Sequence, residues 1–191
     1  MHGHILAGTL ALAVGLSSCS DVAGPRADDG DAGVAQVAAQ GTQLRVNGGG
    51  SYNAGVIVDF AMNGIVHGGG NVSGSFRHTT ASEGFPIEFI GQVTCIGHDP
   101  VNNRAWIGGI ITANNSTHPG FTGEIHQVGR DIWFRLVDYG NGGSGVADRT
   151  TFVGFEGSAD IITSLEYCDT KPWPDADART NALLTGNLIV N

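Results

Sequence analysis

The stretch IWFRLV at residues 132–137 decides the fold class of this chain, because its apolar side chains recur at every second position. Ile132, Phe134 and Leu136 fall on one side of an extended backbone, and the residues between them fall on the other. The stretch is also rich in the β-branched and aromatic residues that strands favour. It is therefore predicted to be a strand with one face in a core.

The same period of two continues along the chain on both sides of this strand. The apolar positions that share a face are Val56, Val58, Phe60 and Met62, then Ile87, Phe89, Val93 and Cys95, and finally Leu184, Leu188 and Val190. Clusters of Gly, Asn, Asp and Pro between the runs are predicted turns, at residues 47–50, 63–64, 67–71, 98–103, 114–120 and 138–145. Roughly eight to ten short strands at this spacing predict an all-β fold, an antiparallel β-sandwich or barrel. At most one short helix is expected, near residues 159–167.

The composition agrees with an all-β domain and excludes one class of partner. Gly accounts for 31 of 191 residues, about twice its ordinary share, as expected for a chain with many tight turns. Charged residues make up only 14%, which argues against a coiled coil or a salt-bridged helical bundle. The net charge of −9 repels phosphate backbones, so the sequence predicts no nucleic-acid binding.

Residues 1–18 are predicted to be a lipoprotein signal peptide. An apolar stretch of 12 residues, Ile5–Leu16, is too short to span a bilayer and has the length of a signal-peptide core. It ends in Leu-Ser-Ser-Cys, which resembles the lipobox of bacterial lipoproteins, and this resemblance implies a diacylglycerol on the thiol of Cys19. Asp21 lies one position beyond the residue that retains such proteins at the inner membrane, so the outer membrane is preferred. The alternative is an ordinary secretory signal, and both readings place the protein outside the cytoplasm.

Residues 19–40 are predicted to be a flexible tether, and residues 41–191 a single β-domain. The tether has no amphipathic order and few large apolar residues, and it carries the acids Asp28, Asp29 and Asp31. These acids lack the spacing and the closing Glu of an EF-hand, so a linker is favoured over a calcium loop.

Three segments resemble strands of a group of exported bacterial β-rich proteins. They are GQVTC at residues 91–95, NRAWIGGIIT at residues 103–112 and FRLVDYG at residues 134–140. The likeness extends from about Gly48 to Arg149 and implies an all-β fold and export. The group has no established activity, so the resemblance carries no catalytic residue to this chain.

The cysteines predict a disulfide between Cys95 and Cys168. Lipidation would consume Cys19 and leave an even pair in an oxidising compartment. The alternative is two free thiols, with Cys95 buried on its strand face.

The acidic C-terminal third predicts a calcium site in the loops between Asp138 and Asp177. Candidate ligands are Asp138, Asn141 and Asp148 around one loop, with Asp175 and Asp177 on another. Carboxylate, amide and backbone oxygens are the ligands that calcium prefers. The alternative is a solvated acidic face without a metal.

Motifs for nucleophilic or phosphate chemistry are missing from the sequence. No G-x-S-x-G occurs, and the G-x-G-x-x-G at residues 140–145 is followed by a predicted strand rather than a helix. The single Lys, Lys171, precedes a Pro and cannot belong to a Walker loop. None of the histidines His67, His78, His98, His118 and His126 forms a metal-binding pair with another, although Glu124 and His126 would share a strand face.

Two further groups of side chains are candidates for carbohydrate chemistry. Glu156, Asp160 and Glu166 could supply a pair of carboxylates for glycoside hydrolysis, depending on their separation in space. Trp106, Tyr139 and Trp173 could stack on sugars, and the alternative is that most of them complete the core.

The sequence therefore predicts a lipid-anchored domain of the cell envelope with a non-catalytic binding or scaffolding role. Its expected partners are the membrane, through the lipid on Cys19, and an unidentified protein or small molecule. Calcium is the one cofactor considered. Two alternatives stay open: an exported hydrolase with a carboxylate or metal site on its loops, and a small-ligand or carbohydrate-binding protein.

Overall fold

The computed structural model describes residues 41–140, 145–157, 160–174 and 177–191. The predicted signal peptide, the tether and Cys19 lie outside the described residues. None of the helices in the described part of the chain is long and apolar enough to cross a membrane.

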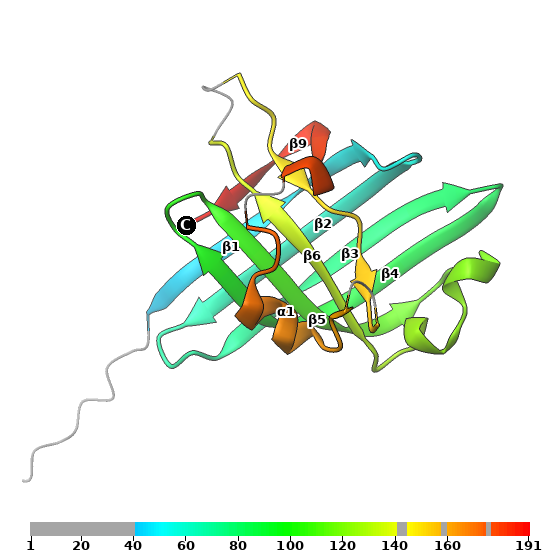
Figure 1. Ribbon diagram of the computed structural model, residues 1–191, viewed down its shortest axis with the longest axis horizontal. Coiled ribbons are helices and arrows are strands. Elements are labelled where there is room, and N and C mark those ends of the chain that lie inside the picture. Colours follow the sequence, from blue (N-terminus) through cyan, green and yellow to red (C-terminus); the bar gives the residue numbers. More distant parts are fainter. Residues whose placement is uncertain (1–40, 141–144, 158–159, 175–176) are drawn as a thin grey trace, which may run out of the picture. The chain divides into compact units, whose positions relative to one another are not determined.

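The described residues form one antiparallel sheet of nine strands, which confirms the all-β class (Figure 1). The strands are β1 (Thr42–Asn53), β2 (Ile57–His67), β3 (Val72–Ser82), β4 (Phe85–Asp99), β5 (Arg104–Asn114), β6 (Asp131–Val137), β7 (Arg149–Thr150), β8 (Gly154–Phe155) and β9 (Asn181–Val190). The helical elements described are α1 (Ser164–Thr170) and the short 3-10 turns η1 (Pro119–Phe121), η2 (Glu124–His126) and η4 (Asp177–Arg179).

The sheet closes on itself, so the fold is a barrel rather than a sandwich. From β1 to β6, each strand pairs with the next one in the chain. β6 then pairs with β7, β7 with β9, and β9 with β1, which completes the circuit. β8 adds a short second pairing to β6 beyond β7. Closure removes the unpaired strand edges that an open sheet exposes.

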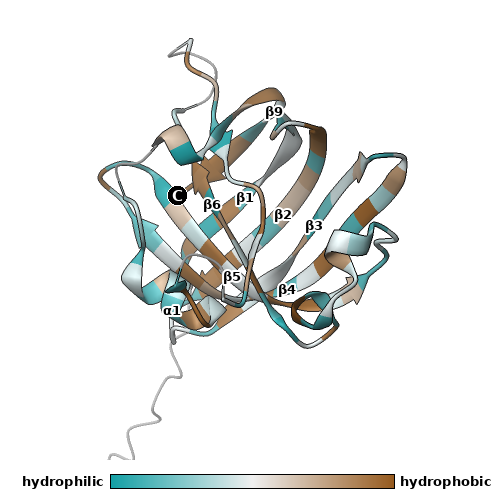
Figure 2. Ribbon diagram, turned by 45° about the vertical axis from the view of Figure 1, so that its right-hand side comes forward, coloured by the Kyte–Doolittle hydropathy of each residue, from teal (hydrophilic) through white to brown (hydrophobic). Residues whose placement is uncertain are grey.

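Apolar side chains from every long strand fill the interior. The predicted alternation is confirmed in β2, where Val58, Phe60 and Met62 are buried in this core. In β6, Ile132 and Phe134 are buried in the same core. Figure 2 shows hydrophobic and hydrophilic residues alternating along the strands. One face of each strand is therefore buried by closure, as its period of two requires.

Two bulges shift this alternation and correct two of the predicted core positions. The pairing of β4 with β5 skips Thr94, so Cys95 leaves the face of Val93 and points out of the barrel. The pairing of β9 with β1 likewise skips Leu184, which is exposed, while Leu183 enters the core in its place. An extra residue moves all the following side chains to the other face, and the hydropathy pattern does not locate it.

Two of the predicted turns were wrong, because residues 47–50 lie inside β1 and residues 63–64 inside β2. The glycines of β1 are needed for close approach rather than for reversal of the chain. A Cβ built on Gly50 would lie 1.9 Å from the carbonyl oxygen of Thr185 on the neighbouring strand. Gly186, paired with Gly50, has φ of +94° and would place a Cβ 1.9 Å from the oxygen of Gly49. The turns predicted at residues 67–71 and 98–103 do connect β2 to β3 and β4 to β5.

The helix α1 occurs about one turn later in the chain than predicted. Its N-cap is Thr163, whose hydroxyl accepts a hydrogen bond from the backbone nitrogen of Glu166 at 3.1 Å. The Glu166 carboxylate accepts a hydrogen bond from the backbone nitrogen of Ile162 at 3.0 Å. The side chains of Thr163 and Glu166 therefore both accept from backbone N–H groups at the start of the helix. Lys171 ends the helix in the left-handed conformation, with its N–H bonded to the oxygen of Tyr167.

A pair of sulfurs at disulfide distance joins α1 to the outside of the barrel. The sulfurs of Cys95 on β4 and Cys168 on α1 are 2.11 Å apart, as the cysteine count predicts. Gly97 and Gly108 leave room for the helix, because a Cβ on either would lie within 2.6 Å of its backbone oxygens. The bulge at Thr94 turns Cys95 toward the helix and thereby makes this link possible.

We expect Gly186→Ala to destabilise the protein far more than Gly84→Ala. Gly84 has φ of +84° with open space around its Cβ position, so alanine there costs only the ~1–2 kcal/mol of a left-handed residue. Alanine at position 186 adds a clash with β1, which costs ~1–3 kcal/mol more. Urea denaturation of both variants measures the difference, and equal losses of unfolding free energy would contradict the close approach of β1 and β9.

Candidate ligand-binding site

A second apolar cluster lies on the outer side of β5 and β6. Trp106 and Trp133 point away from the barrel interior and pack with Ile161 and Tyr167. The rings of Trp133 and Tyr167 are stacked, with centroids 5.7 Å apart. β6 is consequently buried on both faces, because α1 and the chain around it cover its outer side (Figure 1).

Three consecutive carbonyl oxygens fasten the chain after α1 to this outer wall. The indole nitrogen of Trp106 donates to the oxygen of Pro172 at 3.0 Å. Arg135 donates through Nη1 to the oxygen of Trp173, and Arg104 does so to the oxygen of Pro174. These bonds hold Trp173 at φ of +55°, a conformation that non-glycine residues rarely adopt. Such a residue persists where its surroundings impose it, and it marks a candidate functional position.

A pocket of about 170 Å³ opens beside Trp173 on this wall. The side chains that line it include, from the buried floor to the exposed rim, Trp133, Arg135, Tyr167, Phe152, Trp173 and Arg179. They come from β6, from the chain between β7 and β8, and from the segment that follows Thr163. An apolar and aromatic lining with few polar groups is typical of small-molecule sites.

The charged groups of this pocket are arginines held by aromatic rings. The guanidinium carbon of Arg179 lies 4.3 Å from the centroid of the Trp173 ring, and that of Arg135 lies 6.0 Å from the Trp106 ring. Burial raises the pKa of Tyr167 well above its ordinary value, although the charge of Arg135 opposes the shift. The phenol therefore stays protonated and keeps its hydroxyl hydrogen at neutral pH.

A wider groove of about 570 Å³ lies beside the cysteine pair. Its walls are Val66 and Val72 of the β2–β3 hairpin with Leu165 of α1, and its charged residues are Asp169 and Lys171. Its two charged residues have opposite signs, and its walls are aliphatic rather than aromatic. The groove therefore shows no preference for an ion of either sign or for a planar ring. The pocket beside Trp173 is the better candidate.

The acids predicted to bind calcium are used in part to hold β9. The Asp148 carboxylate accepts hydrogen bonds from the backbone nitrogens of Tyr139 and Leu188, at 2.9 and 2.7 Å. The Asp138 carboxylate accepts from Gly140 and Val190, at 2.7 and 2.9 Å. Each of the four carboxylate oxygens thus accepts a hydrogen bond from a backbone N–H group. These bonds account for the positions of the two acids without a metal.

The other predicted calcium ligands cannot be placed. Asn141, Asp175 and the side chain of Asp177 lie outside the described residues. No group of three or more acids, histidines and cysteines gathers in the part of the chain that the structure describes. Calcium binding stays a prediction of the sequence.

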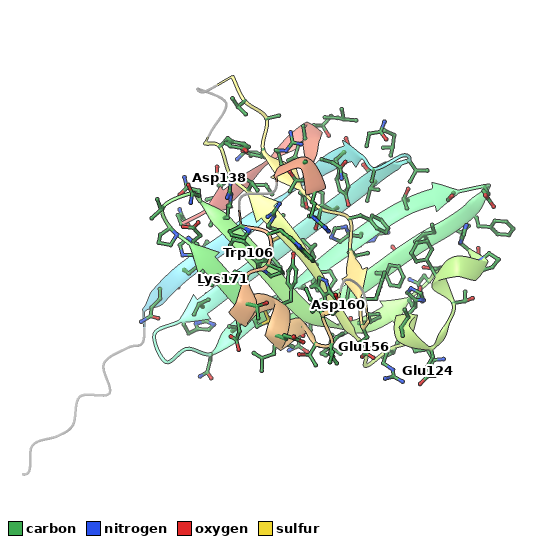
Figure 3. All side chains as sticks on the ribbon, in the orientation of Figure 1. Trp106, Glu124, Asp138, Glu156, Asp160 and Lys171 are labelled. Carbon is green, nitrogen blue, oxygen red and sulfur yellow. A yellow bond between two sulfur atoms is a disulfide. The ribbon has the colours of Figure 1, made fainter. Side chains whose placement is uncertain are left out.

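Glu124 and His126 do not share a strand face, because they form the 3-10 turn η2. The Glu124 carboxylate pairs with Arg130 at 2.5 Å near the surface, at the end of β6 opposite to Asp138 (Figure 3). His126 is buried against the Phe155 ring, with centroids 4.4 Å apart, and burial lowers the pKa of its imidazole. The two side chains therefore have separate partners, an arginine for Glu124 and an aromatic ring for His126.

The three carboxylates considered for glycoside chemistry serve different local structures. Glu156 accepts hydrogen bonds from Arg130 and from the backbone nitrogen of Asp131, both at 3.2 Å. Glu166 caps α1, and Asp160 is exposed at φ of +63°. The structure gives no sign that these groups face a common substrate.

Of the aromatic residues considered for stacking, only Trp173 lines the pocket. Trp106 is fully buried, and Tyr139 lies beyond the end of β6. Trp133, Arg135, Tyr167 and Arg179 were not predicted as site residues. A sequence signal existed for one of them, Trp133, since this residue and Val137 give β6 apolar residues on both faces and thus indicate a covering layer.

His78 is buried inside the barrel, and neither of its ring nitrogens has a hydrogen-bond partner among the described residues. It stacks with Phe60 at 5.6 Å and meets the edge of Phe134 at 4.7 Å, both measured between ring centroids. Burial lowers its pKa from 6.5 to about 3, because the apolar surroundings disfavour the charged ring. The imidazole is therefore a neutral part of the core at neutral pH.

We expect this histidine to make the protein acid-sensitive. In the unfolded chain it binds a proton below pH 6.5, whereas in the folded chain it does so only near pH 3. Stability is therefore complete above pH 6.5 and is lost as the pH falls toward 3, by about 1.4 kcal/mol per pH unit. His78→Leu should lose about 3 kcal/mol less than the parent protein between pH 7.5 and pH 4.5.

Urea denaturation at the two pH values measures this difference. His67→Gln is the control, because His67 is half-buried and its ring bonds to the Ser73 hydroxyl at 2.9 Å. It should behave as the parent protein does. If His78→Leu loses as much unfolding free energy between the two pH values as the parent protein does, the buried neutral imidazole is not the cause of the acid sensitivity.

Comparisons of the chain with protein-family models, with curated proteins and with solved structures find no match. The fold and the pocket beside Trp173 are therefore the basis for assigning a function.

Proposed function

We propose that the chain is a lipid-anchored extracytoplasmic domain that binds a small molecule without converting it. The pocket beside Trp173 is the observation that carries this proposal. A rigid barrel wall forms its floor, and the hydrogen bonds to the carbonyls of Pro172, Trp173 and Pro174 fix its cover. Binding sites held by such rigid elements need little ordering when a ligand enters, and this favours affinity.

The chemistry of the pocket supports binding over hydrolysis. Its described lining holds the hydroxyls of Thr151 and Tyr167 and two arginines, but no carboxylate, histidine or cysteine. General acid–base catalysis most often uses histidine or a carboxylate, and cysteine is a common nucleophile in covalent catalysis. The barrel interior is the weaker candidate for a ligand, because apolar side chains from all the long strands occupy it.

The proposed location outside the cytoplasm rests on two features of the chain. The Cys95 and Cys168 sulfurs lie at disulfide distance, and such bonds persist in oxidising compartments. The apolar leader ends in the Leu-Ser-Ser-Cys sequence at Cys19. A lipid there would hold the barrel at the membrane surface, within reach of molecules in the cell envelope.

Binding at the pocket can be tested through the indole N–H signals of the three tryptophans in nuclear magnetic resonance spectra. We expect a set of single-ring compounds to shift the signals of Trp133 and Trp173, which line the pocket. The Trp106 signal should move less, since its N–H is bonded to Pro172. Phe152→Ala should weaken the response, and Phe85→Ala, an exposed phenylalanine outside the pocket, should not. Shifts that survive Phe152→Ala unchanged would place the ligand elsewhere.

Anchoring can be tested by the intact mass of the exported protein purified from bacterial membranes. We expect a mature chain that begins at Cys19 and carries acyl groups, because the lipobox directs cleavage before this residue. Cys19→Ala should lack the acyl mass, and it should be released from the membranes without detergent. A parent protein that begins at another residue without acyl groups is an ordinary secreted protein.

A further inference from the structure

We propose that the molecule bound beside Trp173 is a six-membered ring that carries a carboxylate. This inference rests on the proposed function, since it names the ligand of the same pocket. Arg179 would bind the carboxylate at the rim, and the ring would occupy the aromatic interior of the pocket.

Arg179 is placed to recognise a planar anion. Its guanidinium carbon lies over the Trp173 ring, 4.3 Å from the ring centroid. Arg179 is an exposed residue. Two parallel N–H groups of a guanidinium match the two oxygens of a carboxylate, and stacking fixes their direction in advance.

The interior of the pocket has the size and lining for one ring. Its volume is about 170 Å³, close to the ~150 Å³ of an apolar protein cavity that binds benzene. Phe152 and Trp173 are half-buried and form the sides, while Trp133 lies at the floor. Aromatic faces pack well against other rings and against the C–H faces of sugars.

The local charge also differs in sign from that of the whole protein. The chain carries a net charge of −9, whereas the charged residues in the described lining of the pocket are Arg135 and Arg179. A positive pocket on an acidic protein attracts an anion and disfavours an ammonium group at the same place. The guanidinium edge of Arg179 alone supplies the carboxylate contact.

Two chemical sources share these features, namely aromatic acids and sugar acids. Benzoate represents the first and glucuronate the second, and each has a neutral partner of similar shape, benzamide and glucose. Titration of all four compounds into the full-length protein, followed by the indole signals of Trp133 and Trp173, measures the four dissociation constants.

We expect one of the two acids to bind about 10-fold or more tightly than its neutral partner, as a hydrogen-bonded ion pair gives. Arg179→Gln should abolish this preference. Arg77→Gln is the matched control, because Arg77 is an exposed arginine of β3 whose loss changes the net charge equally. It should keep the preference, and both variants should unfold at the same urea concentration as the parent protein.

Three results would overturn the inference. Neutral rings that bind as tightly as the acids would remove the role of the carboxylate and leave the pocket as a site for uncharged rings. A preference that survives Arg179→Gln would assign the anion to another group. If neither acid binds, the ligand class is wrong, and if no single-ring compound of any charge shifts the indole signals, the proposed function fails as well.

Discussion

The hydrogen bonds between β1 and β9 join the first strand of the sheet to the last, and the rest of the structure depends on this closure. The two backbones come so close at Gly50 and Gly186 that neither position has room for a Cβ. Closure gives every long strand an inner face, and so the buried phenylalanines and the neutral His78 can share one apolar core. It also leaves β5 and β6 side by side as a continuous wall on which α1 and the following residues pack.

Much of the barrel was predictable from the sequence, because its strands follow a strict period of two. Val58, Phe60 and Met62 are in the core as predicted. Cys95 and Leu184 are on the opposite face to the predicted one, since a bulge is set by backbone pairing between strands and not by hydropathy. The glycines at residues 47–50 resemble a turn in composition, and only the proximity of β9 explains them as strand residues.

The candidate site was less predictable, because it is formed by packing between segments far apart in the chain. The sequence makes Trp173 a candidate for sugar stacking, but its place in the pocket depends on Arg135 and Arg179, which the sequence does not connect to it. The left-handed conformation at Trp173 has no sequence signature, since it is imposed by donors on β5 and β6. The sequence predicts Asp138 and Asp148 as metal ligands, and the structure shows both carboxylates accepting hydrogen bonds from backbone nitrogens of β9.

The distribution of the tryptophans has a spectroscopic consequence. All three belong to the outer cluster or pack against it, whereas the barrel interior contains phenylalanine and tyrosine instead. Intrinsic tryptophan fluorescence therefore responds to removal of the layer formed by α1 and residues 171–174 even while the barrel persists, because this layer covers Trp106 and Trp133. Far-ultraviolet circular dichroism, in contrast, is dominated by the nine strands. When the two signals are followed in one sample, they separate detachment of the outer layer from loss of the barrel.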